Sequence, residues 1–203
     1  MRTPDDWRSL LARWSALALT DEDVIMNLPE QTIGAGWLGY GPAAGESIPQ
    51  AERRLGVSLP PTYSTFLRAT NGWQSAGPFI ARIRPVEEID WFAAQNREWA
   101  EVELEARSDL ARMPDDEYLV YGVAQQPAHI RPEYLLTALQ ISDVTESAVL
   151  LLNPEIQTAD GEWEAWFFAS WKPGANRYRC FWDLMAGELE IYEALRSGQG
   201  ADP

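Results

Sequence analysis

The chain has 203 residues, of which 31 are acidic and 16 basic, and its formal net charge is −15. A field of this sign disfavours nucleic-acid binding, whose affinity comes mostly from cations that neutralise phosphates, and it repels anionic membrane surfaces. The single cysteine excludes an internal disulfide, and one cysteine with one histidine cannot supply a usual zinc ligand set, so we expect no metal site.

The N-terminus predicts a cytoplasmic protein. Asp5, Asp6, Arg8 and Arg13 interrupt any apolar core of a secretory signal, and no apolar run approaches the length that spans a bilayer. The length suits one domain. The acidity favours a basic protein partner, although it serves solubility equally well, and net charge alone does not separate the two.

The first 20 residues predict a helix that packs on the domain. Thr3 can cap it, Pro4 suits its first position, and Trp7, Leu11 and Trp14 recur at helical spacing.

The following segment, up to Gly45, carries five glycines and is interpreted as a loop. Residues 34–39 match the G-x-G-x-x-G pattern of dinucleotide sites, but they lack the strand before and the helix after that such a site requires. We therefore expect no nucleotide cofactor, and we expect Trp37 and Tyr40 to tuck the loop against the core.

A helical hairpin is predicted next. Ser47 can cap a helix that ends at Gly56, and a second helix runs from Pro60-Pro61 to Asn71-Gly72. Residues 79–84 alternate and predict a first strand with a basic outer face.

A helix is predicted to begin near Val86 and to continue through Trp99 to Leu110. Between Pro85 and Tyr118 there are 11 acidic residues and three arginines, so more than half of the net charge lies there. The candidate partner-binding residues in it are Glu87, Glu88, Asp90, Glu98, Glu101, Glu103, Glu105, Asp115, Asp116 and Glu117.

Two interpretations of this acidic segment stay open. A surface of one sign steers a basic protein partner. A solvated helix face followed by a charged loop needs no partner. Trp91, Phe92 and Trp99 among the charges fit either interface anchors or core residues.

The C-terminal half predicts most of the sheet. Residues 118–123 are interpreted as a strand, and residues 134–141 as a strand with its connector. Ala148 to Leu152 is a continuous apolar run typical of a central strand buried on both faces, and Asn153-Pro154 is expected to end it.

Residues 162–171 alternate in a second strand, which folds back through a turn at Asp160-Gly161. One face, interpreted as core, carries Trp163, Ala165, Phe167, Ala169 and Trp171, and the other carries Glu162, Glu164, Trp166, Phe168 and Ser170. Pro173-Gly174 ends the strand, and Asn176 is expected to cap a helix bearing Tyr178, Phe181, Trp182 and Met185.

These elements predict an α+β fold, a single domain with an antiparallel or mixed β-sheet of about five strands flanked by α-helices. The N-terminal helix covers residues 1–20, the main body residues 21–197, and a flexible tail residues 198–203.

Few residues of the sequence indicate a catalytic site. Glu162 and Glu164 lie two apart on a strand, hence on one face and about 7 Å apart, which is compatible with two-carboxylate hydrolysis. Polar residues at a strand edge explain the pair as well. His129 lies in a polar loop and is interpreted as ordinary surface.

Two ordered blocks carry a family resemblance. The strings LLLNP, DGEWEAW and W-x-PG-x-x-RY-x-x-F follow one another from residue 150 to 181, and an earlier block contains Ile48, Glu52, Leu59-Pro60, Tyr63 and Asn71-Gly72. Together they resemble the SUKH superfamily, specifically its cell-wall-assembly-regulator (Smi/Knr-like) branch, over roughly residues 36–190. The motif residues expected to be structural are Trp37, Glu52, Leu59, Pro60, Tyr63, Asn71, Gly72, Asn153, Pro154, Trp163, Trp171, Pro173, Gly174, Arg177, Tyr178 and Phe181.

The resemblance implies a non-catalytic protein-binding module. Bacterial members of the superfamily are immunity proteins that bind and block a toxin, often a nuclease or deaminase, whereas fungal relatives are scaffolds in cell-wall signalling. We therefore expect an immunity protein whose partner is a basic toxin domain, with a regulatory scaffold as the alternative. The N-terminal helix and the acidic segment are interpreted as additions to the family core, so what they bind is not inherited from it.

Overall fold

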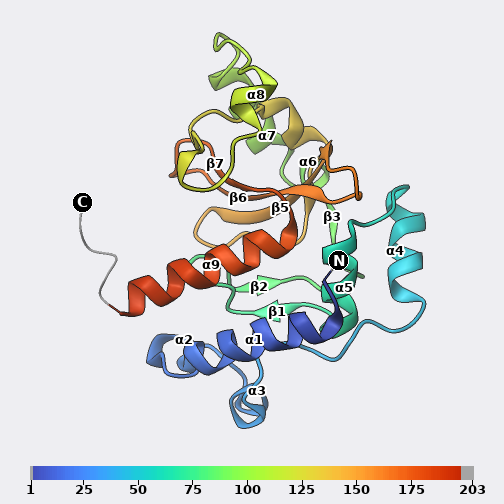
Figure 1. Ribbon diagram of the computed structural model, residues 1–203, viewed down its shortest axis with the longest axis vertical. Helices are drawn as coiled ribbons and strands as arrows, with labels where there is room; N and C mark the ends of the chain where they lie inside the picture. Colours follow the sequence, from blue (N-terminus) through green and yellow to red (C-terminus); the bar gives the residue numbers. More distant parts are fainter. Residues whose placement is uncertain (1, 198–203) are drawn as a thin grey trace.

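The computed structural model describes residues 2–197. Figure 1 shows their elements arranged in layers around one central sheet. In chain order they are α1 (Pro4–Ala18), α2 (Glu22–Met26), α3 (Glu30–Ala35), α4 (Ser47–Leu55), α5 (Pro61–Ala69), β1 (Trp73–Gln74), β2 (Arg82–Ile83), β3 (Asp90–Trp91), α6 (Phe92–Gln95), α7 (Arg97–Ala106), α8 (Asp115–Tyr118), η1 (Gly122–Ala124), η2 (Pro132–Leu136), β4 (Leu139–Gln140), β5 (Ala148–Gln157), β6 (Trp163–Ala169), β7 (Ala175–Tyr178) and α9 (Phe181–Arg196).

The central sheet has the strand order β3-β4-β5-β6-β7, and every pairing in it is antiparallel. The strands β1 and β2 form a separate two-stranded sheet. The predicted α+β fold with about five strands is thus confirmed, and β5 is its central strand as expected.

Alternate side chains of β5 enter two different hydrophobic cores. Leu150 and Leu152 belong to the first core, and Val149 and Leu151 belong to the second. This explains why the sequence of the strand is continuously apolar rather than alternating. The predicted burial on both faces is confirmed.

The first core is built by α1, α5 and α9 against one face of the sheet. The ring of Trp7 lies 5.3 Å from that of Phe66 and 5.4 Å from that of Phe181, so the three helices meet at one aromatic cluster. The predicted N-terminal helix forms with a capping box at Thr3 and packs on the body. Figure 1 shows α9 running below the central sheet, with α1 lower still.

The second core covers the opposite face and is smaller. Its ring contacts centre on Phe168 of β6, which lies 5.1 Å from Trp99 of α7 and 6.3 Å from Phe92 of α6. The second face of β6, which was not predicted to be core, is therefore buried. The strand ends at Ala169, so Trp171 lies beyond it and is half exposed rather than a core residue.

Several predicted boundaries are wrong, and the N-terminal loop is the first of them. Residues 22–26 and 30–35 are short helices. The side chain of Asp21 caps the first, and the second ends at Gly36, whose backbone is in the left-handed conformation. Neither helix has a buried residue, so no apolar periodicity marks them in the sequence. The helix that Ser47 was expected to cap begins with Ser47 itself.

In the middle of the chain, tertiary pairing overrides local pattern. The predicted strand at 79–84 shrinks to Arg82–Ile83, and the helix expected from Val86 begins at Phe92, because residues 90–91 pair with β4. Residues 118–123 form the end of α8 and a 3-10 turn instead of a strand. The strand and connector expected at 134–141 are a 3-10 helix followed by β4.

Near the C-terminus, β5 does not end at Asn153-Pro154 but continues to Gln157 through a register shift. A bulge tolerates proline because the extra residue needs no ladder hydrogen bond. Residues 175–178, expected to begin a helix, form the edge strand β7, and α9 begins only at Phe181. The tail expected at 198–203 lies outside the described residues.

Candidate protein-binding surface

The helices α7 and α8 carry most of the predicted acidic residues at one end of the molecule, the upper end in Figure 1. Six of the carboxylates there are exposed: Glu98, Glu101, Glu105, Asp115, Asp116 and Glu117. We call these six residues the acidic surface. Residues 97–117 hold eight acidic residues and three arginines, so this short segment carries a net charge of −5 out of −15.

The other four candidates are placed differently. Glu103 is only 13 % exposed because it pairs with Arg107 one helical turn away. Asn71 after α5 donates to Glu87, Arg82 of β2 pairs with Glu88, and the carboxylate of Asp90 accepts the amide of Trp91. The structure therefore brings six of the ten residues to one end of the molecule, where Glu101 pairs with Arg97 and Asp115 with Arg131, and it gives the other four partners of their own.

The aromatic residues among these charges do not serve as exposed anchors. Phe92 is fully buried, Trp99 stacks on Phe168, and Trp91 packs against the first core. Exposed apolar side chains near the acidic surface come instead from Val102, Leu110 and Leu119.

A groove of about 280 Å³ opens beside the end of α7. Its apolar lining includes Leu104, Met113 and Ile130, and exposed His129 also lines it. Its charged lining residues are Arg107, Arg112, Arg131 and Glu133, so the groove itself is not part of the acidic surface.

The helix α8 is held on the body by the ring of Tyr118. The guanidinium carbons of Arg131 and Arg177 lie 4.2 Å and 4.0 Å from the centre of that ring. Its hydroxyl donates to the carboxylate of Glu164 over 3.0 Å. Burial and the charge of Glu164 raise the pKa of Tyr118 far above its usual range, so the hydroxyl remains a donor.

Glu164 is the centre of a buried polar network. Its carboxylate is fully buried and accepts hydrogen bonds from five side chains: Tyr118, Tyr121, Asn153, Trp166 and Arg177. Five donors satisfy the lone pairs of one buried carboxylate, which is the condition for keeping such a charge in a core. Through this network β6 and β7 hold α8, and with it Asp115, Asp116 and Glu117, in position.

The predicted carboxylate pair does not form one site. Glu162 accepts hydrogen bonds from the amide and the hydroxyl of Thr62, at 2.9 Å and 2.6 Å, in the first turn of α5. Burial outweighs these bonds and raises the pKa of Glu162. Trp7 of the first core donates its indole N–H to the carbonyl of Thr62, whereas Tyr118 and Trp166, two partners of Glu164, belong to the second core. The sequence pattern placed both carboxylates on one face because Glu162 was assumed to belong to the pleated strand, which begins one residue later.

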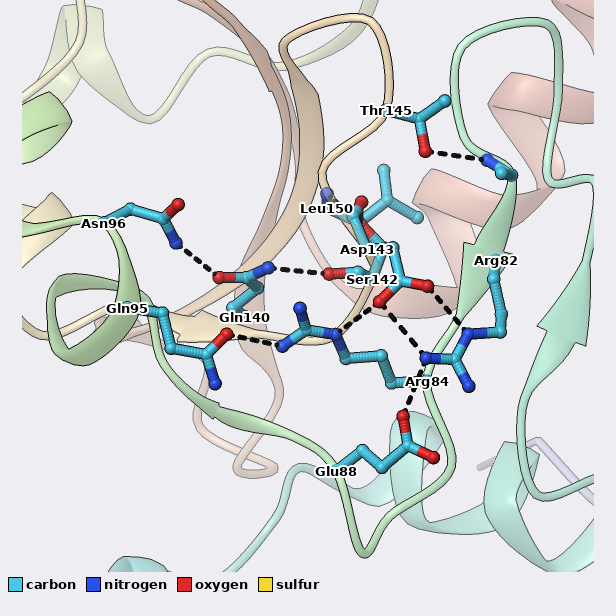
Figure 2. A network of polar contacts seen from close by, with 11 residues as sticks. Arg82, Arg84, Glu88, Gln95, Asn96, Gln140, Ser142, Asp143, Thr145 and Leu150 are labelled. Atoms are coloured by element: carbon cyan, nitrogen blue, oxygen red, sulfur yellow. Dashed lines mark hydrogen bonds and ion pairs between the residues drawn. The ribbon is translucent and has the colours of Figure 1, made fainter.

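The expected basic outer face of residues 79–84 is neutralised in the structure. Figure 2 shows the carboxylate of Asp143 between the guanidinium groups of Arg82 and Arg84, with N–O distances of 2.7 Å and 2.8 Å. Glu88 takes a second hydrogen bond from Arg82, at 2.7 Å. These contacts raise the pKa of Arg82 and lower that of Asp143, and they join the small sheet to the turn before β5.

The family-motif residues lie mostly in the interior and support the fold. The fully or largely buried ones are Leu59, Pro60, Tyr63, Gly72, Asn153, Trp163, Gly174, Arg177 and Phe181, the half-buried ones are Trp37, Glu52, Asn71, Pro154 and Tyr178, and Pro173 and Trp171 are exposed.

Two motif side chains connect segments of backbone. Glu52 accepts the amide of Leu59 between the two hairpin helices, and Asn71 accepts the amide of Val86. Trp37 packs edge-on against Trp73 at 5.2 Å, so it holds the preceding segment on the core as predicted. Gly174 has a φ of +82°, and a side chain there would collide with the carbonyl of Pro127.

Tyr118, Tyr121 and Arg131, which surround the attachment of α8, were not predicted as functional residues. Two tyrosines three residues apart after an acidic run indicate side chains on one side of a helical turn, but no local pattern predicts that both bind Glu164. Among residues 2–197, no three His, Cys, Asp or Glu side chains are grouped so as to hold a metal ion.

Residues 42–186 match the model of the SMI1 / KNR4 family (SUKH-1), which spans well over half of the chain. The chain belongs to this family. The match includes the acidic surface and all of the central sheet, whereas α1, α2 and α3 precede it.

The family is known for immunity proteins and is generally non-catalytic. No curated protein matches the chain. None of the helices in residues 2–197 has both the length and the apolar character required to cross a bilayer.

Proposed function

We propose that this SUKH-1 protein is a cytoplasmic immunity protein that binds a basic toxin domain, of nuclease or deaminase type, and neutralises it by stoichiometric occlusion of the toxin's active site. The family membership supports a protein-binding role of this class. A role of this kind requires a rigid, complementary surface and no catalytic residues.

The acidic surface is the observation that carries the proposal. Six exposed carboxylates on α7 and α8 share one end of the molecule, flanked by exposed Val102, Leu110 and Leu119. Carboxylates presented this way resemble the phosphates that a nuclease binds, so they are complementary to a basic catalytic cleft. Long-range attraction between such surfaces accelerates encounter, and the apolar side chains exclude water once the partners meet.

The rigid attachment of α8 supports the same role. Because Tyr118 is clamped between two guanidinium groups and bonded to Glu164, the charges of α8 are already fixed before a partner arrives. A preformed surface loses less conformational entropy on binding than a mobile one.

The first experiment is affinity capture from a lysate of the source organism with the tagged protein, at low and at high salt, followed by mass spectrometry. We expect one basic protein retained nearly stoichiometrically. Expressed alone, the captured protein should arrest growth, and co-expression of this chain should restore it. Several weak partners and no growth arrest would contradict immunity and favour a regulatory scaffold.

A charge variant tests whether the acidic surface forms the interface. In Glu98→Gln/Glu101→Gln/Glu105→Gln, we expect the association rate with the captured protein to fall about tenfold or more at low salt and to lose most of its salt dependence. Glu103 is left intact because its side chain is mostly buried and paired with Arg107.

The matched control removes the same charge elsewhere. Glu30, Glu46 and Glu190 are exposed on α3, before α4 and on α9, and Gln at all three should change the association rate much less. Equal slowing by both variants would mean that only net charge matters, and the acidic surface would be removed from the interface.

A further inference from the structure

A second groove, of about 700 Å³, lies away from the acidic surface. Its lining comes from α2, from the hairpin between β1 and β2, from the turn before β5 and from Tyr192 of α9. In Figure 1 this region is at the side of α2 and the end of α9, whereas α7 and α8 lie at the opposite end of the long axis.

The two hairpins that form one wall are locked together. The hydroxyl of Thr145 accepts the amide of Ala81 at 3.4 Å, and the amide of Asp143 donates to the carbonyl of Arg82 at 3.0 Å. Figure 2 shows the contact of Thr145 near the Arg82–Asp143 pair. The wall is therefore preformed rather than assembled on binding.

Both hairpins have non-glycine residues in the left-handed region of backbone conformation. Ser75 has a φ of +53°, Glu146 of +49° and Ser147 of +57°. Such conformations are strained, and they persist where the surrounding structure holds them. At this groove they direct the side chain of Glu146 to the lining.

The charge of the groove is negative. Asp21, Asp23 and Glu146 line it, and no Lys or Arg is among the lining residues of the described chain. Asp21 is already engaged, since it accepts from Tyr192 at 2.9 Å and pairs with Arg196 at 2.9 Å. Asp23 and Glu146 are exposed, and within residues 2–197 no side chain donates to their carboxylates.

An exposed aromatic pair adjoins the groove. Trp171 is 51 % exposed and donates its indole N–H to the carbonyl of Glu146 at 2.8 Å. Its ring lies 4.9 Å from that of Phe79, which is 39 % exposed and follows the lining residue Pro78. Exposed tryptophan is a frequent anchor in protein interfaces.

We propose that this groove binds an extended, arginine-containing segment of a partner protein. An arginine of that segment stacks on Trp171 and pairs with the carboxylate of Glu146, while a neighbouring apolar residue occupies the lining of Val24 and Leu28. The volume lies within the range of about 300–1,000 Å³ that encloses small ligands and short chain segments.

Arginine fits this site better than lysine. The planar guanidinium stacks on an aromatic face and binds a carboxylate with two parallel hydrogen bonds, whereas the ammonium of lysine is a strongly hydrated point charge. An aromatic ring beside a free carboxylate is the combination that uses both properties of the guanidinium.

The site is independent of the proposed immunity surface. It draws its residues partly from Asp21 to Leu28, which precede the residues matched by the family model. Failure of peptide binding here would leave the role of the acidic surface intact, and the reverse also holds.

The test uses a short fluorescein-labelled peptide that alternates arginine with leucine, and a matched lysine–leucine peptide, in fluorescence polarisation with the full chain. We expect saturable binding of the arginine peptide at physiological salt, and about tenfold weaker binding of the lysine peptide. No saturable binding, or equal affinity for both peptides, would overturn the proposal.

Variants locate the binding. Trp171→Ala should weaken the arginine peptide about tenfold or more, and Glu146→Gln about threefold to tenfold. Glu46→Gln, which removes one exposed charge away from the groove, should leave the affinity unchanged. Thermal melting checks that each variant is folded. If Trp171→Ala does not fold, the affinity of Glu146→Gln for the arginine peptide decides the test.

Backbone and indole chemical shifts in an NMR titration distinguish the two acidic regions. We expect the arginine peptide to shift the signals of residues 75–81 and 145–147 and the indole N–H of Trp171. Shifts confined to residues 97–119, or equal weakening by Glu101→Gln/Glu105→Gln and Glu146→Gln, would place the peptide on the acidic surface and refute the groove.

Discussion

The two faces of the central sheet are buried by different means. The first core joins α1, α5 and α9 through apolar and aromatic side chains, and each of the two buried carboxyl groups beside it has a single partner residue, Tyr178 for Glu188 and Thr62 for Glu162. The second core is smaller and contains Glu164, whose carboxylate accepts hydrogen bonds from five side chains.

The difference shows how one sheet supports both stability and a positioned surface. Apolar contact is non-directional, so the first core stabilises the body without specifying one exact arrangement of its side chains. A buried charge with directional donors tolerates one arrangement only, because each lost partner leaves a desolvated polar group. The second core therefore determines where α8 and its charges lie.

The largest expected effect comes from breaking the buried pair of Glu164 and Arg177. In Glu164→Gln the guanidinium, which is fully buried, loses its counter-charge, and we expect the free energy of unfolding to fall by about 3–5 kcal/mol. Urea denaturation measures it. Adding Arg177→Met should recover part of the loss, and a cost below about 1 kcal/mol for the single change would contradict the network.

Tyr118→Phe should lower the free energy of unfolding by a smaller amount. It keeps the ring beside the two guanidinium groups and removes one hydrogen-bond donor to Glu164. Hydrogen bonds to charged groups contribute about 1.5–3 kcal/mol. Hydrogen exchange should show faster local opening of residues 107–121 than of α9. Uniform acceleration across the chain would mean that Tyr118 stabilises the whole body rather than the acidic end.

Replacing Glu188 is expected to stabilise the folded state at neutral pH, in contrast to the two changes above. Burial outweighs its bond from Tyr178 and raises the pKa of Glu188 above its ordinary value of 4.5. The folded state then holds the proton more tightly than the unfolded state, so stability falls as pH rises from about 4.5 through the folded pKa. Glu188→Gln should flatten this dependence and increase the melting temperature at neutral pH. An unchanged pH profile would refute the assignment.

The smallest effect on the free energy of unfolding is expected from a change at the acidic surface itself. Glu101 pairs with Arg97 over 2.8 Å, and both side chains are exposed. Exposed pairs contribute little because water and salt screen them. Glu101→Gln should therefore leave unfolding in urea almost unchanged, and a substantial loss of stability would show that this surface is structural rather than a binding face.

Much of the fold was predictable because its signals are local. The N-terminal helix and the α4–α5 hairpin follow from capping residues and apolar periodicity, and β5 follows from five apolar residues that no exposed element would carry. The motif residues that carry the family resemblance could also be recognised from the sequence, since most of them serve packing or backbone geometry.

The remaining elements depended on distant partners. The strand β3 exists because residues 90–91 meet β4, and β7 exists because residues 175–178 meet the edge of β6. Of the ten acidic candidates, six face solvent at one end, and the place of the three on α8 depends on Tyr118, Arg131 and Arg177 meeting in space.

The sequence by itself determined the α+β class, the central strand, the family and the excess of negative charge, because these depend on composition, on short-range periodicity and on ordered motifs. The tertiary structure decided which carboxylates are buried, paired or free. Glu162, Glu164 and Glu146 are alike in the sequence, and they differ only in the donors that surround them. Those donors come from residues far along the chain, and no local pattern specifies them.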